Sequence, residues 1–545
     1  MKDDSFWYKN AVFYEVNVRA YCDGSGDGHG DFQGLLQKLD YMQELGVDCL
    51  WLLPIYPSPL CDDGYDIADY FNILDTYGSL EDFKELVEAV HRRGMRIITD
   101  LVLNHTSDQH PWFQAARSSR TSPYRNYYVW SDTDKQFKDA RIIFLDTEPS
   151  NWSWDEVAGQ YYWHRFYASQ PDLNYDSPDV QQAMLEVIKF WLDLGVDGFR
   201  ADAVPYLFER EGTNCENLPE THAYLKKLRR FIDEHYPGRI LLCEANQWPE
   251  DVRPYFGEGD EFQLGFHFPL MPRIYMALRC ADKSPIEWIL NRTPPIPPDC
   301  QWCTFLRNHD ELTLEMVTEE ERQWMWQEYA PQARMRLNLG IRRRLAPLLD
   351  NDRRKIELAN SLLFTLTGSP VIYYGDEIGM GDEIELPDRN GVRTPMQWNA
   401  GLNAGFSTAS PDELYAPIIT KTPYGPDLVN VAAQQQDTTS LWHALHRMIL
   451  VRKSNTVLGS GDLTWIDTGL ASVIAYRRSD ALDSLFILNN LSGKPQRISI
   501  AQSVGQSLAW TDLFDSHKTY QPQNGLLSLE LAPYQYLWLR QGNHT

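Results

Sequence analysis

Four carboxylates in this sequence each follow a short apolar run: Asp100 in RIITD, Asp202 in GFRAD, Glu244 in ILLCE and Asp310 in FLRNHD. A lone acid at such a place is usually a helix N-cap or a surface group, but four at corresponding positions predict a site. Arg200 precedes Asp202 by two residues, so in a strand the two side chains share one face. We expect this guanidinium to keep Asp202 ionised at neutral pH, as a nucleophile requires.

The other members of the set suggest which chemistry the carboxylates perform. Glu244 follows an apolar run, and partial burial should let it keep its proton, as a general acid must. One ionised and one protonated carboxyl group are the pair that glycoside chemistry uses. His105 and His309 are candidate neutral donors to sugar hydroxyls, with a purely structural hydrogen bond as the alternative.

The elements that must position these residues follow a repeating pattern. An amphipathic helix, a glycine, a short apolar run and a polar residue recur, which is the alternation of a parallel α/β fold. We expect eight strands, within residues 12–18, 47–54, 95–100, 196–202, 239–243, 263–267, 302–306 and 370–374. Eight parallel strands predict a closed (β/α)8 TIM barrel, whose strand ends meet at one mouth. A doubly wound sheet would need a glycine-rich dinucleotide loop, which the sequence lacks.

Changes of pattern along the chain predict three additions to the barrel, which we expect at residues 1–105 and 177–455. Residues 106–176, rich in Tyr, Trp, Ser and Asp, predict an inserted loop-rich subdomain after the third strand. Residues 312–355 predict a helical insertion after the seventh strand, beside the mouth. From residue 456 to 545, short alternating runs predict an all-β C-terminal domain of the sandwich type.

Composition excludes several classes of protein. The formal net charge of −26 argues against a nucleic-acid partner, which would need a Lys/Arg footprint. The eight cysteines show no disulfide framework, and we interpret Cys300 and Cys303 as structural rather than metal-binding. No run of 18 apolar residues and no apolar N-terminal segment occur, so we expect no membrane span, no export signal and a cytoplasmic location.

Several of these strings resemble a known family. DLVLNH (100–105), GFRADAV (198–204), Glu244 and RNHD (307–310), with QPDLN (170–174), are similar to the motifs of the α-amylase superfamily of glycoside hydrolases. The resemblance spans nearly the whole chain. It implies that Asp202 is the nucleophile, Glu244 the acid/base and Asp310 a carboxylate that stabilises the oxocarbenium-like transition state, with Asp100, Arg200, His105 and His309 in support.

Longer strings, over residues 244–261, 266–279, 307–317, 339–354 and 391–398, resemble the branch of the superfamily that isomerises maltose to trehalose. This resemblance implies an intramolecular, retaining glucosyl transfer in two displacements, with hydrolysis to glucose as a side reaction. Water must then be excluded, and our hypothesis is that residues 312–355 form the lid, an ordinary barrel decoration being the alternative. The partners would be maltose, trehalose and glucose.

Two other functions compete with this one. A plain α-glucosidase, hydrolysing maltose or related α-glucosides, would use the same residues, because only the attacking hydroxyl differs. A non-catalytic carbohydrate-binding relative should lack at least one catalytic carboxylate, whereas all three are present here.

The resemblance also implies how the substrate pocket is built. In GYD (64–66), Tyr65 would stack on the non-reducing glucose and Asp66 would bind its distal hydroxyls. Arg393 would pair with Asp66 and close the pocket floor, so that disaccharides are favoured over starch.

Structural calcium is expected at two places, with no organic cofactor. In DGSGDGHGD (23–31), Asp23, Asp27 and Asp31 recur every four residues, with Ser25 where relatives usually have Asn; a metal-free Asp/Gly turn is the alternative. A second site, implied by the resemblance, would use Asn104, Asp172, Glu209 and the backbone carbonyls of Tyr206 and Leu207.

Because relatives often form dimers or larger assemblies, a homo-oligomer is also expected.

Overall fold

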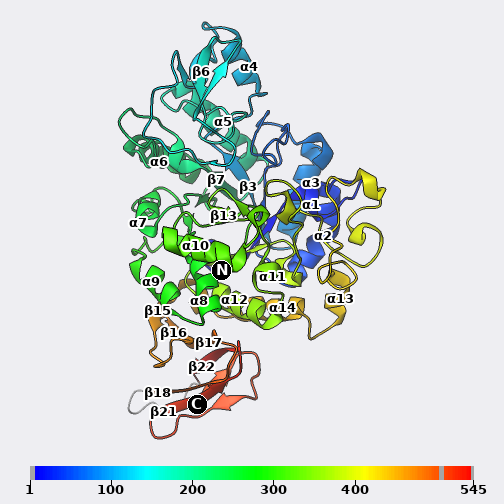
Figure 1. The fold of residues 1–545 in the computed structure, drawn as a ribbon, viewed down its shortest axis with the longest axis vertical. Coiled ribbons are helices and arrows are strands. Elements are labelled where there is room, and N and C mark those ends of the chain that lie inside the picture. Colours follow the sequence, from blue (N-terminus) through cyan, green and yellow to red (C-terminus); the bar gives the residue numbers. More distant parts are fainter. Residues whose placement is uncertain (1–5, 502–508, 542–545) are drawn as a thin grey trace.

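The computed structural model of the chain describes residues 6–501 and 509–541 (Figure 1). Its centre is a closed barrel of eight parallel strands in the order β1-β14-β10-β9-β8-β7-β3-β2. The strands are β1 (Phe13–Val16), β2 (Cys49–Leu52), β3 (Arg96–Val102), β7 (Gly198–Asp202), β8 (Ile240–Cys243), β9 (Leu264–Phe266), β10 (Gln301–Phe305) and β14 (Ser369–Tyr373). Each strand overlaps one of the eight expected runs, and the predicted TIM barrel is confirmed.

Helices surround the barrel because each strand is followed by a segment with one apolar stripe (Figure 1). Among them are α2 (Phe32–Leu45), α3 (Leu80–Arg92), α5 (Pro178–Asp193), α6 (Pro219–His235), α8 (Leu270–Cys280), α12 (Arg353–Thr365) and α14 (Leu441–Lys453). Helix α3 begins with a reciprocal capping box between Ser79 and Asp82, and it buries Phe83, Leu86 and Val90 against the barrel. The local signals and the fold therefore agree.

The segment after β3 forms a separate small body at one end of the molecule (Figure 1). It contains α4 (Pro111–Ser118) and a three-stranded sheet of β4 (Trp130–Ser131), β6 (Gln160–Trp163) and β5 (Trp152–Asp155). The two ends of this segment are held together where His105 and Asp172 form an isolated β-bridge. The segment consequently leaves and re-enters the barrel at one point on its mouth.

The second insertion is only partly helical. It contains α10 (Glu319–Tyr329) and α11 (Leu345–Leu348), but also a small antiparallel sheet of β11 (Leu312–Thr313), β13 (Gly340–Ile341) and β12 (Arg336–Leu337). The expectation of a helical insertion was therefore incomplete, because strands of two residues are too short to show an alternating pattern.

The C-terminal part is all-β, as predicted, and lies at the opposite end from the first insertion (Figure 1). One sheet has six strands: β15 (Asp462–Trp465), β16 (Val473–Ser479), β17 (Ser484–Asn490), β22 (Tyr536–Gln541), β19 (Trp510–Asp512) and β20 (Thr519–Tyr520). A second sheet pairs β18 (Gln496–Ala501) with β21 (Leu526–Leu531), and side chains such as Phe486, Trp510 and Leu529 form a shared core. Residues 502–508 and 542–545 of the expected 456–545 domain lie outside the described residues.

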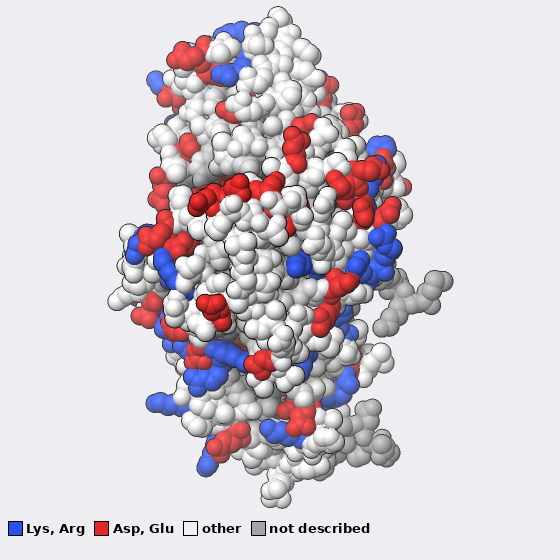
Figure 2. Space-filling model, turned by 90° about the vertical axis from the view of Figure 1, so that its right-hand side faces the viewer, with Lys and Arg blue, Asp and Glu red and all other residues white. Residues whose placement is uncertain are grey.

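The charges on the visible surface are mixed, and the cysteines are unpaired. On the face shown in Figure 2, the described Lys and Arg side chains are scattered among Asp and Glu and form no continuous basic area. All eight cysteines are free thiols, and Cys300 and Cys303 are buried. No helix within residues 6–501 and 509–541 has the length and apolarity needed to cross a bilayer.

Candidate active site

Arg200 is the centre of a buried cluster of three carboxylates. Its Nη1 lies 2.6 Å from Asp100 Oδ1 and 2.6 Å from Asp202 Oδ1, and its Nη2 pairs with Glu244 Oε1. Asp100 and Arg200 are register partners on β3 and β7, and Glu244 directly follows β8. The charged residues within an apolar strand are thus accommodated because three neighbouring strands present compensating groups to one another.

The pKa values of Asp202 and Glu244 are both raised, and that of Glu244 is the higher of the two. Burial raises the pKa of Asp202 to about 6; Arg200 opposes the rise and Asp100 adds to it. Burial also raises the pKa of Glu244 to about 7; Arg200 opposes this rise, and the nearby Asp202 carboxylate adds to it. Arg200 was expected to keep Asp202 ionised, but the pKa of Asp202 is raised, because burial outweighs the effect of a guanidinium that is shared among three carboxylates. At pH 7 Asp202 nevertheless stays largely ionised while Glu244 keeps much of its proton.

Backbone strain beside Asp202 helps to place Glu244. Ala203 adopts the left-handed conformation, with φ 53° and ψ 33°, at the start of η4 (Val204–Tyr206). Its N–H thereby donates to Glu244 Oε2 at 3.1 Å. A non-glycine residue pays on the order of 1–3 kcal/mol for such a conformation, which marks a position fixed by its surroundings.

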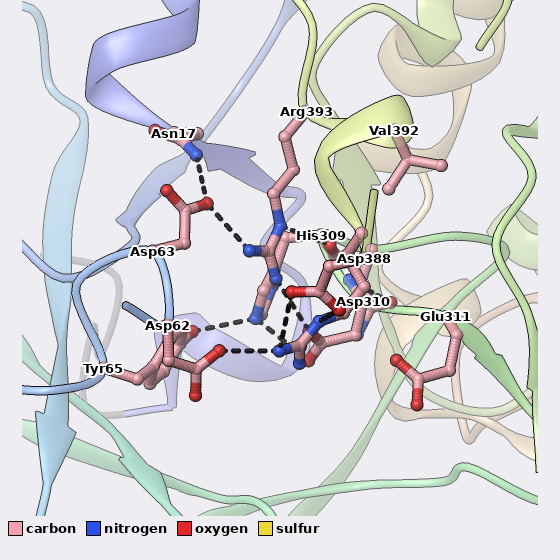
Figure 3. A network of polar contacts seen from close by, with 12 residues as sticks. Asn17, Asp62, Asp63, Tyr65, His309, Asp310, Glu311, Asp388, Val392 and Arg393 are labelled. Atoms are coloured by element: carbon pink, nitrogen blue, oxygen red, sulfur yellow. Dashed lines mark hydrogen bonds and ion pairs between the residues drawn. The ribbon is translucent and has the colours of Figure 1, made fainter. Parts of the chain in front are cut away.

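Asp310 has a different, cationic environment (Figure 3). Its Oδ1 lies 2.9 Å from Arg389 Nη1 and 3.0 Å from Arg393 Nη2, and its Oδ2 lies 3.1 Å from His309 Nε2. Burial alone would raise the pKa of Asp310, but these three cations lower it well below its usual range. Asp310 is therefore a permanent anion.

The two candidate histidines differ in charge. Burial lowers the pKa of His105 to about 3, so the ring is neutral as expected, while its role as a donor to sugar hydroxyls stays a prediction. Burial would likewise lower the pKa of His309, yet Asp310 and Glu15 raise it to about 10. The expectation of a neutral His309 was wrong, because two carboxylates flank its ring.

One cavity opens beside these groups. Its wall includes five of the ten predicted catalytic and substrate residues: Asp202, Glu244, Asp310, Tyr65 and His105. The other five, Asp66, Asp100, Arg200, His309 and Arg393, are buried but do not line it. Asp202 and Glu244 thus face the same space, and the non-lining residues support the wall from behind.

The predicted pairing of Asp66 with Arg393 does not occur. The Asp66 carboxylate accepts hydrogen bonds from Ser58 Oγ, Cys61 N and Asp62 N, so it shapes its own loop. Arg393 Nη1 instead lies 3.0 Å from Asp63 Oδ2 (Figure 3). The acid that reaches the cavity is thus a different member of the same short loop.

That member is Asp62, which sequence reasoning missed. Its Oδ1 lies 2.6 Å from Arg389 Nη2, and both residues line the cavity. The available signal was the doubled acid in CDDGYD and the basic residue in PDRNG, but neither pattern identifies its partner.

Both insertions contribute to the cavity wall. Phe144 and Phe166 come from the first insertion, and Thr313, Glu315 and Asn338 come from the second. The two insertions also contact each other: Arg141 Nη1 donates to Glu315 Oε2 at 2.7 Å, and Asn338 N donates to Asp146 Oδ2 at 2.8 Å. We call these two contacts the inter-insertion contacts; they bridge the inserted segments beside the cavity.

The second expected metal site has the character of a cation site. Asn104 Oδ1, Asp172 Oδ2 and Glu209 Oε1 are buried oxygens with no hydrogen-bond partner in the part of the chain that the structure describes. Burial raises the pKa of Asp172 to about 8, and burial together with Asp172 raises that of Glu209 well above its usual range. Oxygens from two carboxyls and one amide, left unsatisfied, fit the ligand preference of calcium. Tyr206 and Leu207 lie on the same short segment as Glu209.

The N-terminal loop does not have this character. Asp23 accepts hydrogen bonds from Gly26 N, Gly28 N and Ser407 Oγ, and Asp31 caps α2 through Gly34 N. Asp27 is exposed and accepts from His29 N, while Ser25 Oγ donates to Asp23. Among the described residues, no three His, Cys, Asp or Glu side chains are placed to hold a metal ion. The carboxylates of this loop are thus satisfied by nearby donors, and a metal ion there stays a prediction from the sequence.

Comparisons with known proteins agree with the fold and identify the family. Residues 16–461 match the model of the α-amylase catalytic domain, and residues 463–538 match that of the maltogenic amylase C-terminal domain. The chain is 59% identical over 504 residues to a trehalose synthase/amylase of Mycobacterium tuberculosis, covering 91% of this chain and 84% of that protein. It is 56% identical over 507 residues to a trehalose synthase of Pimelobacter, covering 91% and 88%.

A solved structure extends the comparison to three dimensions. The trehalulose synthase of Pseudomonas mesoacidophila aligns with a TM-score of 0.78 at 27% identity, over 98% of this chain and 99% of that one. The resemblance inferred from the sequence motifs is thus confirmed: the chain belongs to the α-amylase family, and within it to the group of trehalose synthases.

Proposed function

We propose that this chain isomerises maltose to trehalose by retaining glucosyl transfer within the cavity that Asp202 and Glu244 line. The observation that carries the proposal is that Asp202 and Glu244 contact the same guanidinium and face the same cavity, which both insertions help to line. Two carboxyls so close together are the arrangement of a retaining enzyme, in which one attacks and the other transfers the proton.

In the first half of the reaction, an oxygen of Asp202 attacks the anomeric carbon of the non-reducing glucose. The bond to the bridging oxygen breaks, and Glu244 gives that oxygen its proton, so a β-glucosyl-enzyme and one glucose molecule result. The permanent anion Asp310 stabilises the positive charge that develops on the sugar ring. The raised pKa of Glu244, about 7, supplies a proton donor near neutral pH.

In the second half, the released glucose turns within the cavity and presents its anomeric hydroxyl. Glu244, now ionised, removes the hydroxyl proton, and the oxygen attacks the glucosyl carbon and displaces Asp202. The product is an α,α-1,1 linkage, and both carboxyls return to their starting state. Two inversions at one carbon leave its α configuration unchanged.

Other wall residues would position the bound glucose. Tyr65 presents an aromatic face, and His105 is a neutral donor. The ion pair of Asp62 and Arg389 supplies charged groups to the distal hydroxyls, in the role first assigned to Asp66 and Arg393. A wall closed by an ion pair would stop a longer chain, which favours disaccharides.

The inter-insertion contacts support a lid formed by both insertions rather than by residues 312–355 alone. If water entered the cavity during the glucosyl-enzyme stage, it would compete with glucose and release a second glucose. Holding the insertions together would therefore determine how much maltose is isomerised and how much is hydrolysed.

We also propose a structural calcium ion held by Asn104, Asp172 and Glu209, with the carbonyls of Tyr206 and Leu207. Its charge would satisfy the unpartnered oxygens and join the first insertion to the barrel. A cytoplasmic location and a homo-oligomer stay predictions from the sequence.

A carbon NMR spectrum of a maltose digest tests the proposed function. We expect the signal of the α,α-1,1 linkage to appear before most of the maltose is consumed, with glucose as the minor product. Glucose without trehalose would instead establish the alternative, an α-glucosidase using the same residues. Loss of both products in Asp202→Ala would assign either activity to this cavity.

A further inference from the structure

Glu15 is a buried carboxylate that the mechanism above does not use. It is the third residue of β1, whose four residues are all buried, and Glu15 itself is fully inaccessible. An ionised carboxylate in a strand of this kind is costly unless a cation or several donors compensate it. Its partner therefore has to be close, and that partner is His309.

Two hydrogen bonds join the two residues. Glu15 Oε1 lies 2.5 Å from His309 Nδ1 and accepts from the His309 backbone N–H at 3.1 Å. The second bond fixes the backbone of His309 as well as its ring. On the far side of the ring, Nε2 lies 3.1 Å from Asp310 Oδ2 and 2.9 Å from Tyr65 Oη.

These partners determine the protonation of the ring. An ionised carboxylate can only accept, so Nδ1 must carry a hydrogen toward Glu15 and Nε2 must carry one toward Asp310. A histidine that donates from both nitrogens is an imidazolium. The pKa of about 10 for His309 agrees with this geometry.

The charged and titratable groups around His309 come from five parts of the chain. Glu15 belongs to β1, Asp100 to β3 and Asp310 to the loop after β10, while Arg393 Nε donates to the His309 carbonyl at 2.9 Å. Tyr65, from the loop after β2, stacks on the ring with centroids 5.4 Å apart. Glu15 is thus the anion on the side away from the cavity, opposite Asp310.

We propose that Glu15 is a positioning residue for glucosyl transfer: it holds His309 as an imidazolium whose Nε2–H fixes Asp310 and Tyr65 in the cavity wall. Neither Glu15 nor His309 lines the cavity, so they act through residues that do. Without the anion, a neutral His309 would keep its Nδ1–H and turn a bare Nε2 toward the Asp310 carboxylate. Two acceptors would then face each other, and Asp310 would lose one of its three cationic partners.

Glu15→Gln tests this inference because Gln keeps the shape and one acceptor but removes the charge. We expect kcat to fall roughly 10- to 100-fold, the effect of one charge-assisted hydrogen bond, while KM changes less than about threefold. The ratio of variant to wild-type kcat should be larger at pH 6 than at pH 8, because acid restores the imidazolium. A residue that only supported the fold would not produce this pH dependence.

Glu377→Gln is the matched control. Glu377 is also fully buried, and it accepts from Tyr14 Oη at 2.8 Å and Tyr41 Oη at 2.7 Å, away from the cavity. We expect this variant to lower the melting temperature while leaving the pH dependence of kcat as in the wild type. A wild-type kcat at pH 8 in Glu15→Gln would overturn the proposal.

Nitrogen NMR of histidine-labelled protein gives a second, substrate-free test. The chain has 13 histidines, and His309→Asn identifies the relevant signal. We expect imidazolium shifts for His309 in the wild type at pH 8 and neutral shifts in Glu15→Gln; a neutral His309 in the wild type would refute the inference even if the variant failed to fold. The inference rests on the proposed glucosyl transfer, but this test does not, so the two can fail separately.

Discussion

Weakening the inter-insertion contacts should shift the products from trehalose toward glucose. Besides the 2.9 Å ion pair of Arg141 with Glu216, Arg141→Gln removes the 2.7 Å ion pair with Glu315, in which the side chains are 38% and 18% exposed. Because the pair is partly solvated, its contribution to holding the insertions together is about 0.5–1 kcal/mol. That free energy corresponds to a factor of roughly 2 to 5 in the closed-to-open ratio. If water enters only the open form, the share of glucose among the products should rise by the same factor.

The assay is the initial ratio of glucose to trehalose from maltose, measured by NMR at fixed conversion. Asp146→Ala, which removes the acceptor of the Asn338 N–H, should change the ratio in the same direction, because it loosens the same pair of segments. Arg497→Gln is the control, since Arg497 pairs with Glu530 at 3.0 Å in the C-terminal domain. If neither Arg141→Gln nor Asp146→Ala changes the ratio, the insertions do not act as a lid.

Four further outcomes follow from the site. Asp202→Asn should lower both isomerisation and hydrolysis at least about 10⁴-fold, measured as trehalose and glucose formed, and substantial residual turnover would identify another nucleophile. The profile of kcat/KM against pH should be bell-shaped: activity falls below about pH 6, where Asp202 gains a proton, and above about pH 7, where Glu244 loses one. An optimum below pH 5 or above pH 8 would contradict these assignments. Asp62→Asn should raise the KM for maltose at least about tenfold. Asp66→Asn should instead lower the melting temperature with little effect on KM. If both substitutions raised KM equally, Asp66 would have to bind the substrate as well. Without metal, folded Asp172 holds its proton up to a pKa of about 8, whereas the unfolded chain loses it near pH 4. The free energy of unfolding should therefore fall as pH rises from about 4 to 8. In thermal melts, added calcium should remove this decline, and a chelator should restore it. If neither calcium nor the chelator changed the melting temperature, the chain would not bind the ion.

The positions of the strands and of the central acids could be predicted because they depend on local patterns. Short apolar runs ending in a carboxylate are visible in one dimension, and a TIM barrel brings such ends together whatever the loops do. Asp202 and Glu244 were therefore expected at the mouth before any contact was known. Arg200 was assigned to Asp202 by the period of a strand, a property of the backbone alone.

Contacts between distant loops could not be predicted in this way. The pairing of Asp62 with Arg389 joins residues 327 positions apart, and two further aspartates, Asp63 and Asp66, stand in the same loop. Which of the three enters the cavity depends on how the loop turns, and Asp66 is withdrawn because it accepts the loop's own hydrogen bonds. The charge of His309 was missed for the same reason: its partner Glu15 lies 294 positions away in a strand that reads as apolar.

The number of cations that contact each carboxylate explains why the catalytic acids titrate differently. Around Arg200, one guanidinium serves three carboxyls, so they cannot all be ionised at low cost, and a proton stays in the group. Asp310 itself contacts three cations, His309, Arg389 and Arg393, and although each of these also pairs with another carboxylate, together they hold the pKa of Asp310 well below its usual range. A double displacement needs both conditions at once: a proton that can be given and taken back, and an anion that does not titrate. The fold provides them by placing Asp100, Arg200 and Asp202 on β3 and β7, and Asp310 with its cations on the loops after β10 and β14.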